Sequence, residues 1–139
     1  MLRNILKPID WSGDFQDYTL WRTLVIEVAA MLMQQYQRTL IMPMTIWRKE
    51  YFDQIMSGLS KLDPDIHHYC LTAPADVIRK RILDRGEQQE GDWIFDQVGR
   101  CVKSFESDHF VEKIDTATKS PQQIIEWLLA DLRTKSIAD

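Results

Sequence analysis

Three arginines have the chemistry and the spacing to hold a chain of phosphate groups. Arg81 and Arg85 are four residues apart in a predicted helix, so both side chains project from the same side. Arg100 lies in the next predicted helix, beside its apolar stripe rather than on it. A guanidinium group keeps its charge and makes paired hydrogen bonds to phosphate oxygens. The three residues therefore point to polyphosphate binding and to charge stabilisation during phosphoryl transfer.

The same arginines also have a plainer explanation. Arg81 and Arg85 belong to the basic segment 79–85, which also contains Asp84, and Arg100 lies in the next predicted helix. Exposed helix faces commonly carry such charges in i, i+4 pairs, and these pairs contribute little to stability. By spacing alone, a solvated surface is the more frequent origin of this pattern. Whether the arginines bind phosphate or form a solvated surface depends on the helices and strands that position them.

Short apolar runs alternate with helical patterns along the chain. Strands are predicted at 39–45, 67–73 and 110–116. Helices are predicted at about 2–9, 19–37, 51–59, 74–86, 92–105 and 120–132. Strands that alternate with helices form right-handed crossovers, which give a parallel sheet covered on both faces. The sequence therefore predicts an α/β fold with three layers, helix, sheet and helix.

Several residues mark the ends of these elements. Gly86 is expected to end its helix in the left-handed conformation, and Ser120 to Gln123 form a capping box with proline at the first helical position. The last residues of the three predicted strands, at their carboxyl ends, are Thr45, Ala73 and Thr116. Ligands of open parallel sheets gather at that edge, so we expect the chemistry there.

The composition is typical of one globular domain spanning residues 1–139. Hydrophobic residues make up 45% and charged residues 27% of the chain. The net charge of −4 argues against nonspecific binding to nucleic acid or to a membrane surface. No apolar run approaches the about 20 residues that cross a bilayer, and segment 1–8 is too interrupted for a signal peptide. We expect a cytoplasmic protein without nucleic-acid or membrane partners.

The cysteines and histidines do not predict a metal site. Cys70 and Cys101 form no CxxC pair, and His67, His68 and His109 have no third ligand at a suitable spacing. Cys70 lies inside a predicted strand and Cys101 on an apolar helix stripe, so both are interpreted as core thiols.

Several short motifs follow one another in a fixed order. They are Phe15-Gln16-Asp17-Tyr18, Trp21-Arg22, Pro43-Met44-Thr45, Arg81, Arg85-Gly86, Trp93, Gln97, Arg100-Cys101 and Ile114-Asp115-Thr116. In this order and spacing, from about residue 1 to 132, the chain resembles the tunicamycin-resistance protein family. These are small P-loop ATP-binding proteins akin to nucleoside and small-molecule kinases.

The resemblance implies a P-loop kinase-like fold and transfer of a phosphoryl group from ATP, with Mg²⁺, to a small molecule, as in antibiotic resistance. Segment 79–101 would be the lid that closes over the phosphates. Arg81, Arg85 and Arg100 would then be catalytic residues that hold those phosphates.

The resemblance also implies which residues would bind the phosphoryl acceptor and which would bind the nucleotide. Asp17 and Arg22 would bind the phosphoryl acceptor, and Thr45 would be a polar group near the phosphates on the acceptor side. Asp115 and Thr116 would border the nucleotide base through backbone contacts. No metal-ligating residue of this chain follows from the resemblance.

The chain departs from the family in one large respect. A P-loop kinase begins with a strand that leads into GxxxxGK(S/T), whose amides and lysine hold the phosphates. None of the five glycines, at 13, 58, 86, 91 and 99, begins such a motif. The first two strands of such a kinase would lie upstream of Met1. Their absence should leave an apolar gap or a non-native strand pairing, and little or no catalysis by this chain alone.

Three explanations remain open, and the first is favoured. The sequence is a fragment or has a misassigned start, or it is a degenerate paralogue that no longer binds ATP. In the third, another chain fills the gap, which makes this a noncatalytic binding or oligomerising module. A nucleotide sensor that closes on ATP without consuming it is a weaker idea.

Overall fold

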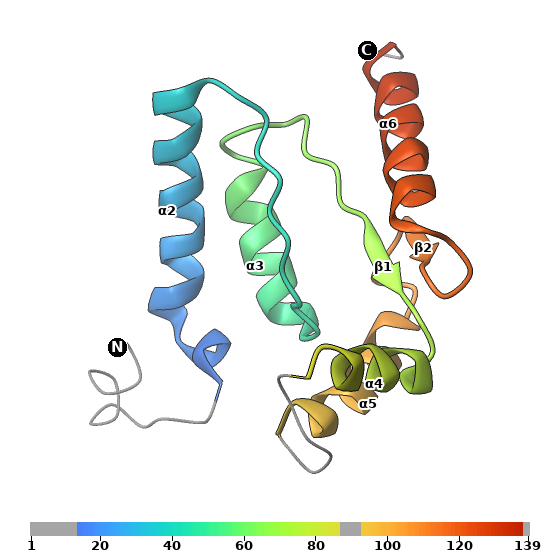
Figure 1. Cartoon of the computed structure of the whole chain (residues 1–139). Helices are drawn as coiled ribbons and strands as arrows, with labels where there is room; N and C mark the ends of the chain where they lie inside the picture. Colours follow the sequence, from blue (N-terminus) through green and yellow to red (C-terminus); the bar gives the residue numbers. More distant parts are fainter. Residues whose placement is uncertain (1–13, 87–92, 138–139) are drawn as a thin grey trace. The chain divides into compact units, whose positions relative to one another are not determined.

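The computed structural model describes residues 14–86 and 93–137. The chain divides into two compact units, residues 1–66 and 67–139, and each is described by itself. The first contains η1 (Phe15–Asp17), α2 (Thr19–Tyr36) and α3 (Lys49–Leu59). The second contains β1 (Cys70–Thr72), α4 (Ala75–Asp84), α5 (Trp93–Phe105), β2 (Lys113–Asp115) and α6 (Pro121–Ile137) (Figure 1).

Helices α2 and α3 pack together and form the core of the first unit. The buried apolar side chains of this core are Ala29, Ile46, Ile55 and Leu59. Glycine at 58 permits the close approach of the helices, because a Cβ atom there would lie 2.2 Å from Cδ1 of Ile26 on α2. This packing places the amino ends of α2 and α3, which carry polar residues, beside each other.

The strand predicted at 39–45 is wrong. Within the residues that the structure describes, this segment is extended but joins no ladder, and the sheet contains only β1 and β2. Its apolar side chains instead pack beside α2, with Leu40 and Met42 against the core of the first unit. An apolar run therefore indicated burial correctly, but a strand also needs a hydrogen-bonding partner, which a run of residues does not reveal.

The second unit is built around a short parallel sheet. Strand β1 pairs with β2 in the register Cys70 to Lys113, Leu71 to Ile114 and Thr72 to Asp115. These strands lie inside the predicted runs 67–73 and 110–116 but are shorter. The fold of the described residues is thus a mixture of helices and parallel strands, consistent with the α/β class.

The predicted left-handed Gly86 and the predicted capping box at 120–123 are both confirmed. Gly86 follows α4 with a φ of 71°, and its N–H donates to the carbonyl oxygen of Leu83. At the start of α6, Ser120 and Gln123 exchange the two hydrogen bonds of a capping box, at 2.8 and 3.3 Å. Position 92, where a helix is predicted to begin, and the predicted helix at 2–9 lie outside the described residues. None of the described helices is long and apolar enough to cross a membrane.

Candidate functional site

Arg22 is the centre of a polar cluster in the first unit. Its side chain lies on α2 and the residue is only 7% exposed. Nε donates to Oε1 of Gln54 at 2.6 Å, Nη2 donates to Oγ1 of Thr19 at 3.1 Å, and Nη1 donates to the carbonyl oxygen of Gln16. The guanidinium carbon also lies 4.1 Å from the centre of the Tyr51 ring. Arg22 therefore links η1, α2 and α3.

Asp17 joins this cluster through α3. The Tyr51 hydroxyl donates to Oδ1 of Asp17 at 2.8 Å, and Nη1 of Arg48 lies 3.5 Å from the same oxygen. Burial, followed by the hydrogen bond to Asp17, raises the pKa of the Tyr51 hydroxyl above its ordinary value. Tyr51 is thus a permanent donor to the Asp17 carboxylate at neutral pH.

The three residues predicted to face the acceptor lie in this one region. Gln16 connects Thr45 to it, because its Nε2 donates to the Thr45 carbonyl oxygen at 3.0 Å. Thr45 therefore contributes its backbone to the cluster, whereas Asp17 and Arg22 contribute side chains. Whether Asp17, Arg22 and Thr45 contact an acceptor stays a prediction.

Sequence reasoning missed three members of the cluster, two on α3 and one at its N-cap, Arg48. Arg48, Tyr51 and Gln54 are three residues apart, which places them along one side of a helix. Tyr51 is easily taken for a core residue of the helix predicted at 51–59, because a phenol ring has the size of a core side chain. These three side chains all have polar groups, and their regular spacing of three residues is the pattern that could have predicted the cluster.

In the second unit, Arg81 binds the carboxyl end of β2. Its Nη1 donates to Oγ1 of Thr116 at 2.9 Å and its Nη2 donates to the Thr116 carbonyl oxygen at 2.6 Å. Thr116 is buried, and its hydroxyl donates to the Thr72 carbonyl oxygen at 3.0 Å. Arg81 thus connects α4 to the ends of both strands, at the edge where the sequence predicts ligand binding.

The other residues predicted for the nucleotide side are differently placed. Oδ1 of Asp115 accepts a hydrogen bond from the Ala117 N–H at 2.8 Å, which shapes the turn after β2. Arg85 and Arg100 are exposed, and among residues 14–86 and 93–137 their side chains have no hydrogen-bonding or ionic partner. Of the three arginines, only Arg81 makes side-chain hydrogen bonds within these residues. Part of the predicted lid, 87–92, lies outside the described residues.

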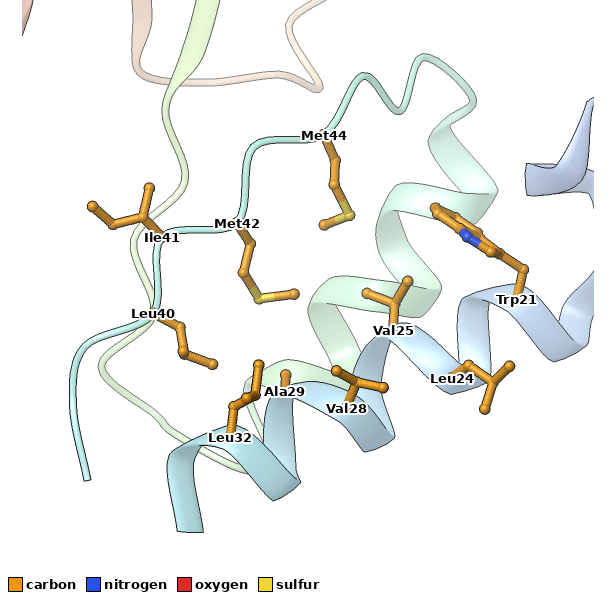
Figure 2. A pocket seen from close by; sticks show the side chains of 10 residues that line it. All are labelled: Trp21, Leu24, Val25, Val28, Ala29, Leu32, Leu40, Ile41, Met42 and Met44. Atoms are coloured by element: carbon orange, nitrogen blue, oxygen red, sulfur yellow. The ribbon is translucent and has the colours of Figure 1, made fainter. Parts of the chain in front are cut away.

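An apolar groove runs along α2 beside residues 40–44. It has a volume of about 380 Å³, and its lining residues are Trp21, Leu24, Val25, Val28, Ala29, Leu32, Leu40, Ile41, Met42 and Met44. Figure 2 shows the side chains of Leu40, Met42 and Met44 directed toward α2, whereas that of Ile41 points away. Ile41 is 90% exposed.

The described part of the chain offers no protein metal site. It contains no group of three histidine, cysteine, aspartate or glutamate side chains that could hold an ion. Cys70 is buried, and burial raises the pKa of its thiol above the ordinary value. Cys70 is therefore a core residue, as the sequence predicts.

The chain was compared with protein-family models, curated proteins and solved structures. No protein-family model matches the chain, and no curated protein does. Among solved structures, the tunicamycin resistance protein of Deinococcus radiodurans matches with a TM-score of 0.73 and 27% sequence identity. The match covers 94% of this chain and 74% of that one. The resemblance of this chain to the tunicamycin-resistance proteins, first indicated by its motifs, is thereby confirmed.

Proposed function

We propose that this chain is the acceptor and lid part of an ATP-dependent phosphotransferase that modifies a small antimicrobial molecule. The observation that carries the proposal is the likeness to a tunicamycin resistance protein over nearly the whole chain, which suggests a resistance-related, kinase-like function. The proposal includes the finer fold of that class, a three-layer α-β-α sheet of the P-loop kinase type.

The second unit would bind the nucleotide. Arg85 and Arg100 have guanidinium groups that are exposed and have no partner among the described residues, which suits binding to phosphate oxygens. Arg81, Asp115 and Thr116 lie at or near the end of β2, where they would border the rest of the nucleotide. Mg²⁺ would enter with ATP, since magnesium in kinase sites is held mainly by phosphate oxygens, water and one or two carboxylates.

The first unit would bind the acceptor. Asp17 would accept a hydrogen bond from the acceptor hydroxyl and take its proton as the hydroxyl oxygen bonds to the γ-phosphorus of ATP. The bond between that phosphorus and the bridging oxygen breaks, and ADP leaves with the electron pair. We expect the 139-residue chain by itself to do this slowly or not at all, because its sequence has no GxxxxGK(S/T) motif.

A thermal melt with millimolar Mg-ATP tests the nucleotide side. Saturation at one hundred times the dissociation constant adds about 2.7 kcal/mol to the free energy of unfolding, which raises the melting temperature by several degrees. We expect Arg100→Ala and Arg85→Ala to reduce this shift. Arg79→Ala is the control, because Arg79 is exposed on α4 but lies on another side of the helix. No shift with ATP, or an equal shift in all variants, would contradict the proposal.

A second candidate function is a noncatalytic oligomerising module, favoured by the groove and the extended segment beside it. Within the described residues, 40–44 has no strand partner, and Ile41 is almost fully exposed. Backbone that is not paired in a ladder can pair with a second copy, because antiparallel pairing about a twofold axis brings the same residues together. The occupant would thus be residues 40–44 of another copy of the chain.

Sedimentation velocity distinguishes this candidate from the first. We expect a dimer at tens of micromolar protein, and a monomer for Ile41→Lys, because a charge on the edge opposes pairing. Met31→Lys is the control, since Met31 is also exposed on α2 but does not line the groove. A wild-type chain that stays monomeric over the whole concentration range rules the module out.

A further inference from the structure

The side chain of Arg48, at the amino end of α3, is held in place by contacts that involve only some of its hydrogen-bond donors. Its guanidinium carbon lies 5.0 Å from the centre of the Trp47 ring and 5.3 Å from that of Tyr51. Nη1 donates to the Tyr51 hydroxyl oxygen at 3.2 Å and lies 3.5 Å from Oδ1 of Asp17. The side chain nevertheless remains 41% exposed. Its position is therefore fixed before any ligand binds, which reduces the entropy lost on binding.

The unused donors of Arg48 form one edge of the guanidinium group. All the polar contacts of Arg48 within residues 14–86 and 93–137 are made by Nη1, so Nε and Nη2 have no partner there. These two nitrogens point their N–H bonds in parallel, which matches two oxygens of a carboxylate or phosphate. Arg22 differs, because all three of its nitrogens already donate and it is buried.

The charges around Tyr51 also favour an anion. Arg22, Arg48 and Asp17 are the charged side chains that act on Tyr51, and two of them are positive and one negative. Among the described residues, Arg22 is hydrogen-bonded only to neutral oxygens. A buried cation without a carboxylate is stabilised when an anion binds close by.

We propose that the Nε–Nη2 edge of Arg48 binds an anionic group of the acceptor, a phosphate or a carboxylate. This inference deepens the proposed function and rests on it. It makes the acceptor a hydroxylated small molecule with an anionic group, whose hydroxyl lies near Asp17. Tyr51 is then a positioning residue, because it holds both Asp17 and Arg48 through its hydroxyl.

Nuclear magnetic resonance of the arginine Nε–H groups tests the proposal without any catalysis. The 139-residue protein is titrated with ribose 5-phosphate, with gluconate as the carboxylate probe and with ribose as the neutral control. We expect ribose 5-phosphate or gluconate to shift the Arg48 Nε–H signal and ribose to bind at least tenfold more weakly. We expect Arg48→Gln to weaken anion binding at least tenfold, and Arg48→Lys to weaken it less, because lysine keeps the charge without the paired donors.

Arg38→Gln is the matched control, because Arg38 is exposed in the same unit and has no polar partner among the described residues. Equal anion binding by wild type and Arg48→Gln overturns the inference, and so does equal binding of ribose and ribose 5-phosphate. If the protein binds Mg-ATP but neither ribose 5-phosphate nor gluconate, the inference is refuted and the proposed function is not. Anion binding that depends on Arg48, in a protein whose melting temperature does not respond to Mg-ATP, refutes the proposed function instead.

Discussion

Arg22→Ala is expected to lower the free energy of unfolding of the first unit by about 3 kcal/mol, since hydrogen bonds to charged groups contribute about 1.5–3 kcal/mol each and are not additive. The substitution removes three donors that serve Gln16, Thr19 and Gln54, and it exposes the face of the Tyr51 ring. The acceptor oxygens of Gln16 and Gln54 would lose their partner in a partly buried place. Urea unfolding with hydrogen exchange measures the loss and assigns it to α2 and α3.

Arg38→Ala is the control for this prediction, because it removes an exposed arginine from the same unit. We expect Arg38→Ala to change the free energy of unfolding by less than about 0.5 kcal/mol. Arg22→Lys should recover little, because an ammonium group cannot serve three acceptors in one plane or stack on Tyr51. A loss below about 1 kcal/mol for Arg22→Ala would mean that the cluster does not depend on this residue.

The consequence for function is specific. Arg22 holds η1, and η1 carries Asp17, so Arg22→Ala should weaken acceptor binding through the position of Asp17. Arg48→Gln, by contrast, should weaken anion binding while the unfolding free energy changes little, because Arg48 is about two-fifths exposed. Loss of Arg22 should therefore be seen mainly in the free energy of unfolding, and loss of Arg48 mainly in anion binding.

Arg81→Ala is expected to lower the free energy of unfolding of the second unit by about 2 kcal/mol, the value for a charged hydrogen-bond donor to a buried group. The substitution removes both donors to Thr116, whose carbonyl oxygen then has no arginine partner. Thr116 also closes the end of the sheet through the Thr72 carbonyl oxygen, so β1 and β2 should fray together. Hydrogen exchange at the Thr116 N–H, which donates to Thr72 at 2.8 Å, reports this directly.

Arg85→Ala provides the comparison, because Arg85 is one turn further along and exposed. It should leave the free energy of unfolding within about 0.5 kcal/mol of wild type. A double-mutant cycle of Arg81→Ala with Thr116→Val isolates the contact, and we expect a coupling of about 1 kcal/mol. A coupling near zero would show that the two side chains stabilise the unit independently. Because Arg81 is needed for the sheet, Arg100→Ala is the cleaner probe of phosphate binding.

Much of the fold follows from local patterns in the sequence. The helices at 19–36, 49–59, 75–84, 93–105 and 121–137 all lie where the spacing of apolar residues places them. The left-handed Gly86 and the Ser120 capping box were also predictable, because each depends on residues a few positions apart. The order of short motifs was enough to indicate the resemblance that the structural match bears out.

The strands were less predictable, because a strand depends on a partner distant in the sequence. The apolar content of 39–45 equals that of a buried strand, yet the segment packs beside α2 without a ladder. The runs at 67–73 and 110–116 do pair, but only three residues of each form the parallel ladder. Sequence alone indicates that such segments are buried, and tertiary structure decides which of them are hydrogen-bonded.

The sequence by itself determined the residue types of the site, and the tertiary structure decided what each of them does. Arg81 was predicted to hold phosphate, but the fold directs its guanidinium group to Thr116, whereas Arg85 four residues later has no such partner among the described residues. Asp17 and Arg22 were predicted as acceptor groups, but only the packing of α3 on α2 supplies Arg48 and Tyr51 beside them. The physical reason is that a charged side chain takes its role from the partners within hydrogen-bonding distance, and these come from segments about 30 residues away in the chain.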